Sequence, residues 1–236
     1  MIVATQLRKR FGAVEVLRGV DLRIARGRVT AIVGPNGAGK TTFIKALLGL
    51  TRPDSGTLTF FGAPVAGDDA YRARIGYMPQ IARFPENLTG HELLALLRDL
   101  RGNPPVDERL LERFTLGDAL RKPLRVLSGG TRQKINAAAA FLFAPPCYVL
   151  DEPTAGLDPI AAGMLKERIR EERAAGNTVI LTTHIMSEID ELADDVVFLL
   201  DGRVAFSGAL SALKRSAGHD HLERAIAELM TREAVA

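Results

Sequence analysis

Hydrophobic and polar positions alternate at the start of the chain and then give way to apolar runs. The segments "IVATQLRKRF" and "VDLRIARG" alternate in the manner of half-buried antiparallel strands. "VTAIVG" follows them and is apolar throughout, which is typical of a strand covered on both faces. Three later segments predict buried strands as well: "CYVLD" (147–151), "TVILTTH" (178–184) and "DVVFLLDG" (195–202). The pattern thus predicts an antiparallel part followed by a buried sheet.

Helical patterns separate the apolar strands. "TTFIKALLGL" follows the first of them, and "LDPIAAGMLKERIREERAAG" lies between two others. In the second segment Asp158 can cap the helix, Pro159 suits its first position and Gly176 suits its left-handed end. Alternating strands and helices predict an α/β core with a mostly parallel sheet.

Residues 81 to about 127 contain helical patterns and no strand candidate. Their first helix, "TGHELLALLRDLRG", opens with a capping box made by Thr89 and Glu92. We infer a small helical subdomain inserted into the core. Near the C-terminus, Leu222, Ile226 and Leu229 occur at helical spacing and predict an amphipathic tail helix.

Composition narrows the classes of function. The 236 residues are 47% apolar, enough for a sizeable core, and 31 Lys+Arg against 28 Asp+Glu give a net charge of +3. Because the basic residues do not cluster, we expect no nucleic-acid partner. The single cysteine, Cys147, excludes an internal disulfide and fits a reducing compartment. No secretory signal is visible, and the apolar run 137–144 is far shorter than the ~20 residues of a membrane span.

The segment "GPNGAGKTT" (34–42) matches the phosphate-binding loop pattern and directly follows an apolar strand. Its glycines let backbone N–H groups turn toward a phosphate, and the helix that follows adds its positive dipole end. Lys40 would contact the β- and γ-phosphates, and the Thr41 hydroxyl would ligate Mg²⁺. The residues expected to bind the nucleotide here are Gly34, Pro35, Asn36, Gly37, Ala38, Gly39, Lys40, Thr41 and Thr42.

Two adjacent acidic residues lie at the end of the strand "CYVLD" and directly after it. Asp151, at the strand tip, fits the support of Mg²⁺ through water. Glu152 follows at the carboxyl edge of the sheet, where ligands of α/β proteins gather, and could polarise an attacking water.

These motifs together resemble the nucleotide-binding subunits of ATP-binding cassette (ABC) transporters, over roughly residues 2–210 and in the family's order. Phe11 resembles the aromatic residue that stacks on adenine, and Gln80 the glutamine of the Q-loop. "LSGGTRQK" (127–134) resembles the signature, "YVLDE" the Walker B strand, "AGLDP" (155–159) the D-loop, and His184 the switch histidine.

The resemblance implies an α/β fold: a P-loop NTPase core with a mostly parallel sheet, an N-terminal antiparallel β subdomain and an inserted α-helical subdomain. We expect a single ABC ATPase domain over 1–236. Within it, 1–80 and 145–210 would form the nucleotide-binding core, 81–144 the helical subdomain with the signature helix, and 211–236 a helical tail.

The resemblance also implies roles for individual residues, with ATP and Mg²⁺ as cofactors. Catalytic roles fall to Glu152, His184, Gln80 and Lys40. Metal binding falls to Thr41, Gln80 and Asp151. Nucleotide contacts outside the phosphate loop fall to Phe11, Ser128, Gly129, Gly130 and Asp158.

Ser128 precedes a helix predicted to begin near Gly129, so its hydroxyl and the helix N-terminus together form an anion site. The resemblance implies that this site covers the γ-phosphate of ATP bound to a second copy, in a two-fold, head-to-tail dimer. The fifth signature residue is usually glutamine and here is Thr131. Because the anion contacts come from Ser128 and backbone N–H groups, we expect activity to survive this change.

The resemblance further implies docking to a separate integral-membrane permease through the cleft near Gln80, at the cytoplasmic face of the cell membrane. Residues 127–159 and "LERAIAELM" also resemble the ATPase that serves copper-site maturation of nitrous oxide reductase, which would imply a copper- or sulfur-related cargo. The alternative is a soluble ABC-type ATPase not coupled to transport. ABC ATPases that act on DNA carry a long coiled-coil insertion, whereas the segment between Lys40 and Ser128 has no heptad run.

Overall fold

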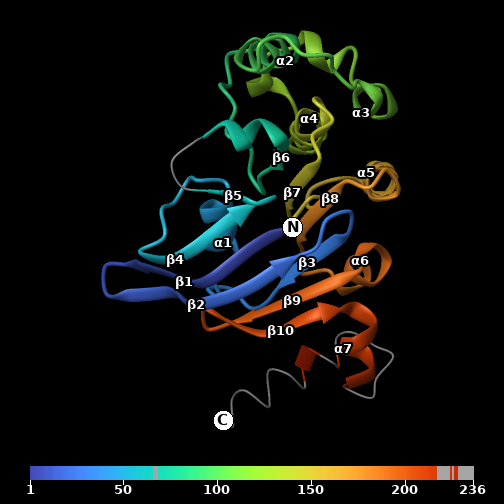
Figure 1. Ribbon diagram of the computed structural model, residues 1–236. Helices are drawn as coiled ribbons and strands as arrows, with labels where there is room; N and C mark the ends of the chain where they lie inside the picture. The colour runs from blue at the N-terminus through green and yellow to red at the C-terminus, as the bar shows by residue number, and fades with distance from the viewer. Residues whose placement is uncertain (66–68, 217–223, 225, 228–236) are drawn as a thin grey trace.

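The computed structural model describes residues 1–65, 69–216, 224 and 226–227. Its body contains two β-sheets (Figure 1). The first is antiparallel with strand order β2-β1-β4-β5, and the alternation of the first segments predicted its strands β1 and β2. Its strands are β1 (Ile2–Phe11), β2 (Val14–Ile24), β4 (Ser55–Phe60) and β5 (Ala63–Pro64).

The second sheet has six strands in the order β10-β9-β3-β8-β7-β6. All neighbouring strands are parallel except β9 and β10, which form an antiparallel pair. Because β3, β7 and β8 are buried at every position, their sequences read as continuous apolar runs. The strands are β3 (Val29–Val33), β6 (Ile75–Met78), β7 (Cys147–Asp151), β8 (Thr178–Thr182), β9 (Asp195–Leu200) and β10 (Arg203–Ala209).

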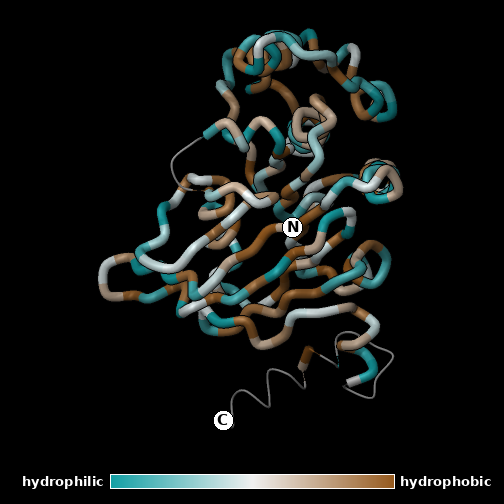
Figure 2. Tube along the Cα trace, in the orientation of Figure 1, coloured by the Kyte–Doolittle hydropathy of each residue, from teal (hydrophilic) through white to brown (hydrophobic). Residues whose placement is uncertain are grey.

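Helix α1 (Lys40–Leu47) follows β3, and its residues Phe43 and Ile44 are buried in the core that joins the two sheets. On the six-stranded sheet α5 (Pro159–Ala174) follows β7, α6 (Met186–Leu192) follows β8, and α7 (Leu210–Ser216) follows β10. Figure 2 shows hydrophobic positions along the strands. This is the predicted α/β alternation.

The segment between β6 and β7 is helical, as predicted, and lies at the end of the molecule away from the antiparallel sheet (Figure 1). Its helices are α2 (Gly90–Leu100), α3 (Arg109–Arg113) and α4 (Gly129–Phe141), with short 3-10 turns η2 (Ala119–Arg121) and η3 (Leu124–Val126); a further turn, η1 (Asp69–Arg74), precedes β6. Leu93, Leu110 and Phe114 from this region share a buried cluster with β3 and β7. The helical segment is therefore packed onto the sheet.

Local signals for helix ends are confirmed. The Thr89 and Glu92 capping box is present, with Thr89 N 2.8 Å from Glu92 Oε2 and Glu92 N 3.2 Å from Thr89 Oγ1. Asp158 Oδ1 accepts a hydrogen bond from Ala161 N at 2.8 Å, and Pro159 occupies the first position of α5. Gly176, just past the end of α5, has the left-handed φ of 82° that its place predicted.

Several strands differ from the sequence pattern. β2 begins at Val14 and is longer than the predicted strand. Its first half is partly exposed and so lacks a clear hydrophobic pattern, but it pairs with β1. β4 and β10 were not predicted, since they are partly exposed and interrupted by Gly56 and Gly208. β8 ends at Thr182, two residues early, so Thr183 and His184 leave the sheet.

Of the predicted tail helix, Leu222 and Leu229 lie outside the described part of the chain, whereas Ile226 is helical, 7% exposed and part of the core, as predicted. The division into 1–80, 145–210, 81–144 and 211–236 stays a prediction. Among the described residues, no helix has the length and apolar character needed to span a membrane.

Candidate active site

The loop between β3 and α1 needs glycine at two positions. Gly34 has φ 150°, and a Cβ there would lie 2.1 Å from the carbonyl oxygen of Leu199. Gly39 has φ 102° at the N-cap of α1, and a Cβ there would lie 2.8 Å from a Leu17 methyl group. The first N–H groups of α1 have no partner inside the helix, so this loop presents donors that suit a phosphate.

Lys40 is the first residue of α1, and its ammonium group folds over the loop. Nζ donates hydrogen bonds to the carbonyl oxygens of Gly34 at 2.7 Å and Pro35 at 3.0 Å. Burial lowers the pKa of Lys40, whereas the negative charges of Glu152 and Asp151 act to raise it. The fold therefore brings Lys40, Asp151 and Glu152 close enough for their charges to interact. Thr41 and Thr42 lie in the first turn of the same helix, and Thr41 is exposed.

Asp151 is the last residue of β7 and is buried. It lies opposite Thr182 of β8, whose hydroxyl donates to Asp151 Oδ1 in a short hydrogen bond. The sequence analysis did not single out Thr182. Its contact depends on the register between two strands far apart in the sequence, although both strands were predicted to end at this edge of the sheet.

Glu152 has a left-handed backbone, with φ 52°. This conformation is unusual for glutamate, and strained positions of this kind cluster at functional sites. The N–H of Glu152 donates a hydrogen bond to the carbonyl oxygen of Thr182 at 3.0 Å. The turn directs the carboxylate toward His184, with Oε2 2.6 Å from Nδ1. The Glu152 side chain is 16% exposed and that of His184 is 74% exposed, so the histidine forms the outer side of the pair.

Gln80 lies at the same edge of the sheet. Met78 of β6 pairs with Leu150 of β7, which places Gln80 just beyond the level of Asp151. The side chain is exposed and lines a cavity of about 520 Å³ together with Gly129 and Gln133 of α4. The structure thus places Gln80 between the sheet edge and the signature helix.

Ser128 is the N-cap of α4, as predicted, and its hydroxyl accepts a hydrogen bond from Thr131 N at 3.1 Å. The Thr131 hydroxyl lies 2.8 Å from the same oxygen, so the residue that departs from the usual signature supports the cap. Ser128 and Gly129 are exposed, and Gly130 is half-buried. Within the described residues no hydrogen bond or ion pair joins 128–130 to the loop 34–42.

Asp158 uses both of its carboxylate oxygens within the chain. Oδ1 caps α5, and Oδ2 forms an ion pair with Lys134 of α4 at 2.8 Å. The hydrogen bond from Lys134 and those from the backbone lower the pKa of Asp158. Lys134 was not predicted to belong to the site. It ties the D-loop segment to the signature helix, where a Cβ on Gly130 would lie 3.2 Å from Gly156 O.

Phe11 ends β1 with 51% of its surface exposed, and Lys9 Nζ lies 5.3 Å from its ring centre. The neighbouring strand β2 reaches the phosphate loop, since a Cβ on Gly39 would lie 3.0 Å from the carbonyl oxygen of Val16. An exposed ring at the end of this hairpin suits stacking against a flat, polar ligand.

The donor set at the sheet edge fits Mg²⁺. The described residues contain no cluster of three or more His, Cys, Asp or Glu side chains that could hold a metal by themselves. Mg²⁺, however, usually binds one or two protein carboxylates together with waters and substrate phosphates. Asp151 is a buried carboxylate within electrostatic reach of Lys40, and Thr41 supplies a hydroxyl in the first turn of α1.

A phosphate loop between a buried parallel strand and a helix, with acidic residues at the neighbouring strand ends, defines a P-loop nucleoside triphosphatase. Comparison with known proteins narrows the class. Residues 17–155 match the family model described as "ABC transporter". The chain belongs to the ABC transporter family and is an ATP-binding, ATP-hydrolysing subunit of this family.

Curated relatives agree. The daunorubicin resistance ATP-binding protein DrrA3 of Streptomyces coeruleorubidus is 40% identical over 227 residues, covering 93% of this chain and 72% of that protein. The Nod factor export ATP-binding protein I of Ralstonia nicotianae is 39% identical over 209 residues, covering 86% of this chain and 65% of that protein.

Solved structures share the fold. One, described as an ATP-binding subunit of an ABC transporter, superposes with a TM-score of 0.91 at 34% identity, covering 98% of this chain and 99% of that chain. A bacterial ABC transporter cassette solved as a dimer superposes with a TM-score of 0.80 at 24% identity, covering 89% of this chain and 99% of that one.

Proposed function

We propose that two copies of this chain face each other head to tail, enclose two Mg-ATP between them, hydrolyse the ATP and thereby drive a separate membrane permease. One observation carries the proposal: the loop 34–42 and residues 128–130 each lead into a helix N-terminus that suits an anion, and no hydrogen bond or ion pair joins them among the described residues. The second site is exposed, so it is free to cover a phosphate held by another copy.

In this dimer the loop 34–42 of one copy and residues 128–130 of its partner would bind the same ATP from opposite sides. Phe11 would stack on the adenine. Asp158 would contribute from the D-loop, which the Lys134 ion pair holds beside the signature helix. A two-fold axis generates both composite sites at once, which is the usual symmetry of a dimer.

Glu152 is proposed as the base that orients the attacking water and accepts its proton. His184 holds the carboxylate at 2.6 Å and faces outward, where it can sense the γ-phosphate. Lys40 would turn from the loop carbonyls to the β- and γ-phosphates. Mg²⁺, held by Thr41, Gln80 and Asp151 through direct or water-mediated contacts, would balance the phosphate charge.

The proposed permease would dock beside Gln80. Exposed apolar side chains lie on the adjoining segments: Leu50, Ile81, Leu96 and Leu100. An open cavity of about 410 Å³ lies between the end of α1, β6 and α2 and is lined by Leu50, Tyr77, Phe84 and Leu97, among others. Such a surface suits an inserted apolar segment of a partner. The subunit would then lie peripherally on the cytoplasmic face of the cell membrane.

The direction of transport is proposed from the names of the relatives, not from residues of this site. Both curated relatives described above are named for drug resistance or export, so we propose an export-type permease. A role in copper-site maturation of nitrous oxide reductase stays a prediction based on resemblance. No specific observation favours the alternative, an ABC-type ATPase not coupled to transport.

The substitution Glu152→Gln tests the proposed chemistry. It keeps the size of the side chain and removes the base, so we expect the steady-state ATPase rate to fall by ~10²-fold or more. Nucleotide binding to the monomer should not change, because it depends on the loop 34–42. The exposed Glu167→Gln serves as the matched control. An ATPase rate within about threefold of the parent would refute the assignment of Glu152 as base.

A further inference from the structure

A buried carboxylate bonds to neighbours of the Glu152–His184 pair and, among the described residues, forms no hydrogen bond or ion pair with Glu152 or His184. It belongs to Glu188, in the first turn of α6, which is 5% exposed. Its Oε1 accepts a hydrogen bond from the Thr154 hydroxyl at 2.5 Å. Its Oε2 accepts one from the Thr183 hydroxyl at 2.9 Å. One side chain therefore joins two loops that are far apart in the sequence.

The position of this carboxylate is costly unless its partners are in place. No Lys, Arg or His of the described chain lies within ion-pair distance of Glu188. Burying an ionised carboxylate is unfavourable unless hydrogen bonds replace the water it loses. Here two hydroxyls supply those bonds, and both are themselves buried, Thr154 at 8% and Thr183 at 4% exposure. The three side chains form a closed polar cluster inside an apolar region.

Both threonines neighbour the reacting pair. Thr154 follows Glu152 by two residues in a tight turn, in which Ala155 N donates to Glu152 O at 3.1 Å. Thr183 directly precedes His184, and its hydroxyl also accepts a hydrogen bond from Ile185 N at 3.1 Å. The backbone on either side of His184 is thus fixed through Thr183, and the loop after Glu152 is fixed through Thr154.

We propose that Glu188 is a positioning residue for ATP hydrolysis. By holding Thr154 and Thr183 together, its carboxylate keeps Glu152 and His184 at the separation that makes Glu152 an effective base. This inference rests on the proposed function of Glu152. It predicts that loss of Glu188 slows the chemical step without weakening nucleotide binding, because a displaced base costs rate while the loop 34–42 stays intact.

The test compares full-length variants by kcat, KM and the dissociation constant for a fluorescent ATP analogue. Glu188→Ala should lower kcat by about tenfold or more and leave that dissociation constant within about twofold. Thr183→Val, which keeps the branched shape and removes the hydroxyl, should lower kcat in the same direction. Glu188→Gln keeps one carbonyl acceptor and should fall between Glu188→Ala and the parent.

Glu191→Gln is the matched control, since Glu191 lies on the same helix and pairs only with Lys166 and Arg170 among the described residues. It should keep the parent kcat. In a His184→Ala background, Glu188→Ala should cause little further loss, because both changes would disable the same pair. A purely structural role would give additive losses in kcat and a weaker affinity for the nucleotide.

Two results would overturn the proposal. The first is a kcat for Glu188→Ala and Thr183→Val that equals that of Glu191→Gln. The second is full additivity with His184→Ala. If Glu188→Ala does not fold, Thr183→Val and Thr154→Val give the same readout. The variant Glu152→Gln separates the two hypotheses. A parent-like ATPase rate in Glu152→Gln refutes the proposed function. A lost rate in Glu152→Gln together with a parent-like kcat in Thr183→Val refutes only the role of Glu188.

Discussion

Gly34 and Gly37 lie in the same phosphate loop but carry different constraints. Both have positive φ, 150° and 83°. A Cβ on Gly34 would overlap the Leu199 carbonyl oxygen at 2.1 Å, whereas a Cβ on Gly37 would meet nothing within 4 Å. Leu199 belongs to β9, so the close approach at Gly34 joins the loop to the parallel sheet. The same residue type thus serves tertiary packing in one case and local backbone conformation in the other.

This difference predicts unequal effects on stability. Gly34→Ala must displace the backbone of β9, so we expect it to lower the free energy of unfolding by ~3 kcal/mol or more. Gly37→Ala carries only the strain of a left-handed backbone, about 1 kcal/mol. Urea unfolding followed by circular dichroism measures both. Equal losses in the two variants would show that the contact with Leu199 does not constrain the loop.

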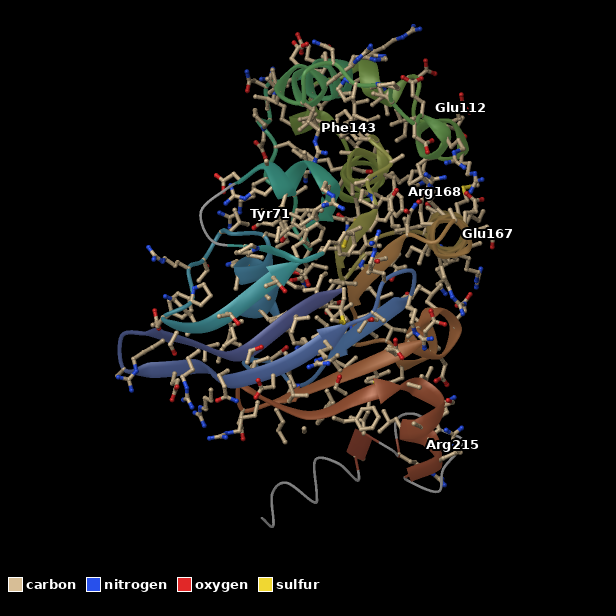
Figure 3. The ribbon with its side chains drawn as sticks, in the orientation of Figure 1. Tyr71, Glu112, Phe143, Glu167, Arg168 and Arg215 are labelled. Carbon is tan, nitrogen blue, oxygen red and sulfur yellow. The ribbon has the colours of Figure 1, made fainter. Side chains whose placement is uncertain are left out.

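At the scale of elements, α5 is joined to the helical segment by a buried arginine (Figure 3). The Arg168 side chain is 1% exposed and pairs with Glu172 of its own helix and with Asp107, at 2.6 Å, in the loop before α3. Its guanidinium also lies 5.5 Å from the ring centre of Phe141 in α4. A buried charge requires partners, and those of Arg168 come from α5, from the loop before α3 and from α4.

Arg168→Ala should therefore destabilise the fold strongly. The substitution removes the cation that Asp107 shares with the buried Glu172, and breaking a buried pair costs ~3–5 kcal/mol. Arg170→Ala, two residues away on the same helix, removes only partly exposed ion pairs and should cost less than ~1 kcal/mol. Chemical denaturation of both variants checks this, and similar midpoints would contradict it.

The same network predicts a dependence on pH. Burial alone would raise the pKa of Asp107, but hydrogen bonds from Arg109 and the charge of Arg168 outweigh it, and the pKa lies below its ordinary value. A carboxyl with a lowered folded-state pKa stabilises the fold above its unfolded pKa, about 4. That contribution is lost as pH falls through the folded-state pKa. Arg168→Ala should therefore show a smaller loss of stability between about pH 5 and pH 3 than the parent.

At the scale of the whole molecule, the proposed dimer depends on an exposed surface around the start of α4. A Cβ on Gly129 would meet nothing within 4 Å, and φ there is not positive, so the single chain tolerates a side chain. In the proposed dimer the same position faces the γ-phosphate of the other copy. A negative charge there would repel the phosphate.

Gly129→Asp should accordingly leave stability and monomer nucleotide binding unchanged and abolish ATP-dependent dimerisation. The experiment uses the Glu152→Gln background with Mg-ATP and measures mass by light scattering after size exclusion. Gly117→Asp is the matched control, because Gly117 is also exposed, has no positive φ and would accept a Cβ without contact. A Gly129→Asp protein that dimerises like the control would refute the head-to-tail arrangement.

Much of the fold could be predicted from local sequence patterns. The buried strands β3, β7, β8 and β9 and the caps of α2 and α5 follow from apolar runs and from single polar residues at helix starts. β4 and β10 could not be predicted in this way. They are partly exposed and contain glycine, and what makes them strands is hydrogen bonding to β1 and β9.

Part of the candidate site could likewise be predicted from the sequence, and part could not. The loop 34–42, the pair Asp151 and Glu152, and Ser128 were found from short motifs, because each motif lies within one turn or one strand end. Thr182, Lys134 and Glu188 were missed. Each has a partner about 24 to 34 positions away in the sequence, namely Asp151, Asp158 and Thr154, and no spacing rule connects residues across separate strands and helices.

The sequence by itself determined the buried strands, the helix caps and the residues that can bind a phosphate, since these depend on side chains within a few positions of one another. Only the tertiary structure decided which of them meet: that Lys40 interacts with Asp151 and Glu152, that Glu152 faces His184, and that Glu188 joins Thr154 and Thr183. The physical reason is that such contacts depend on strand register and on the packing of helices against the sheet. These are properties of the whole folded chain.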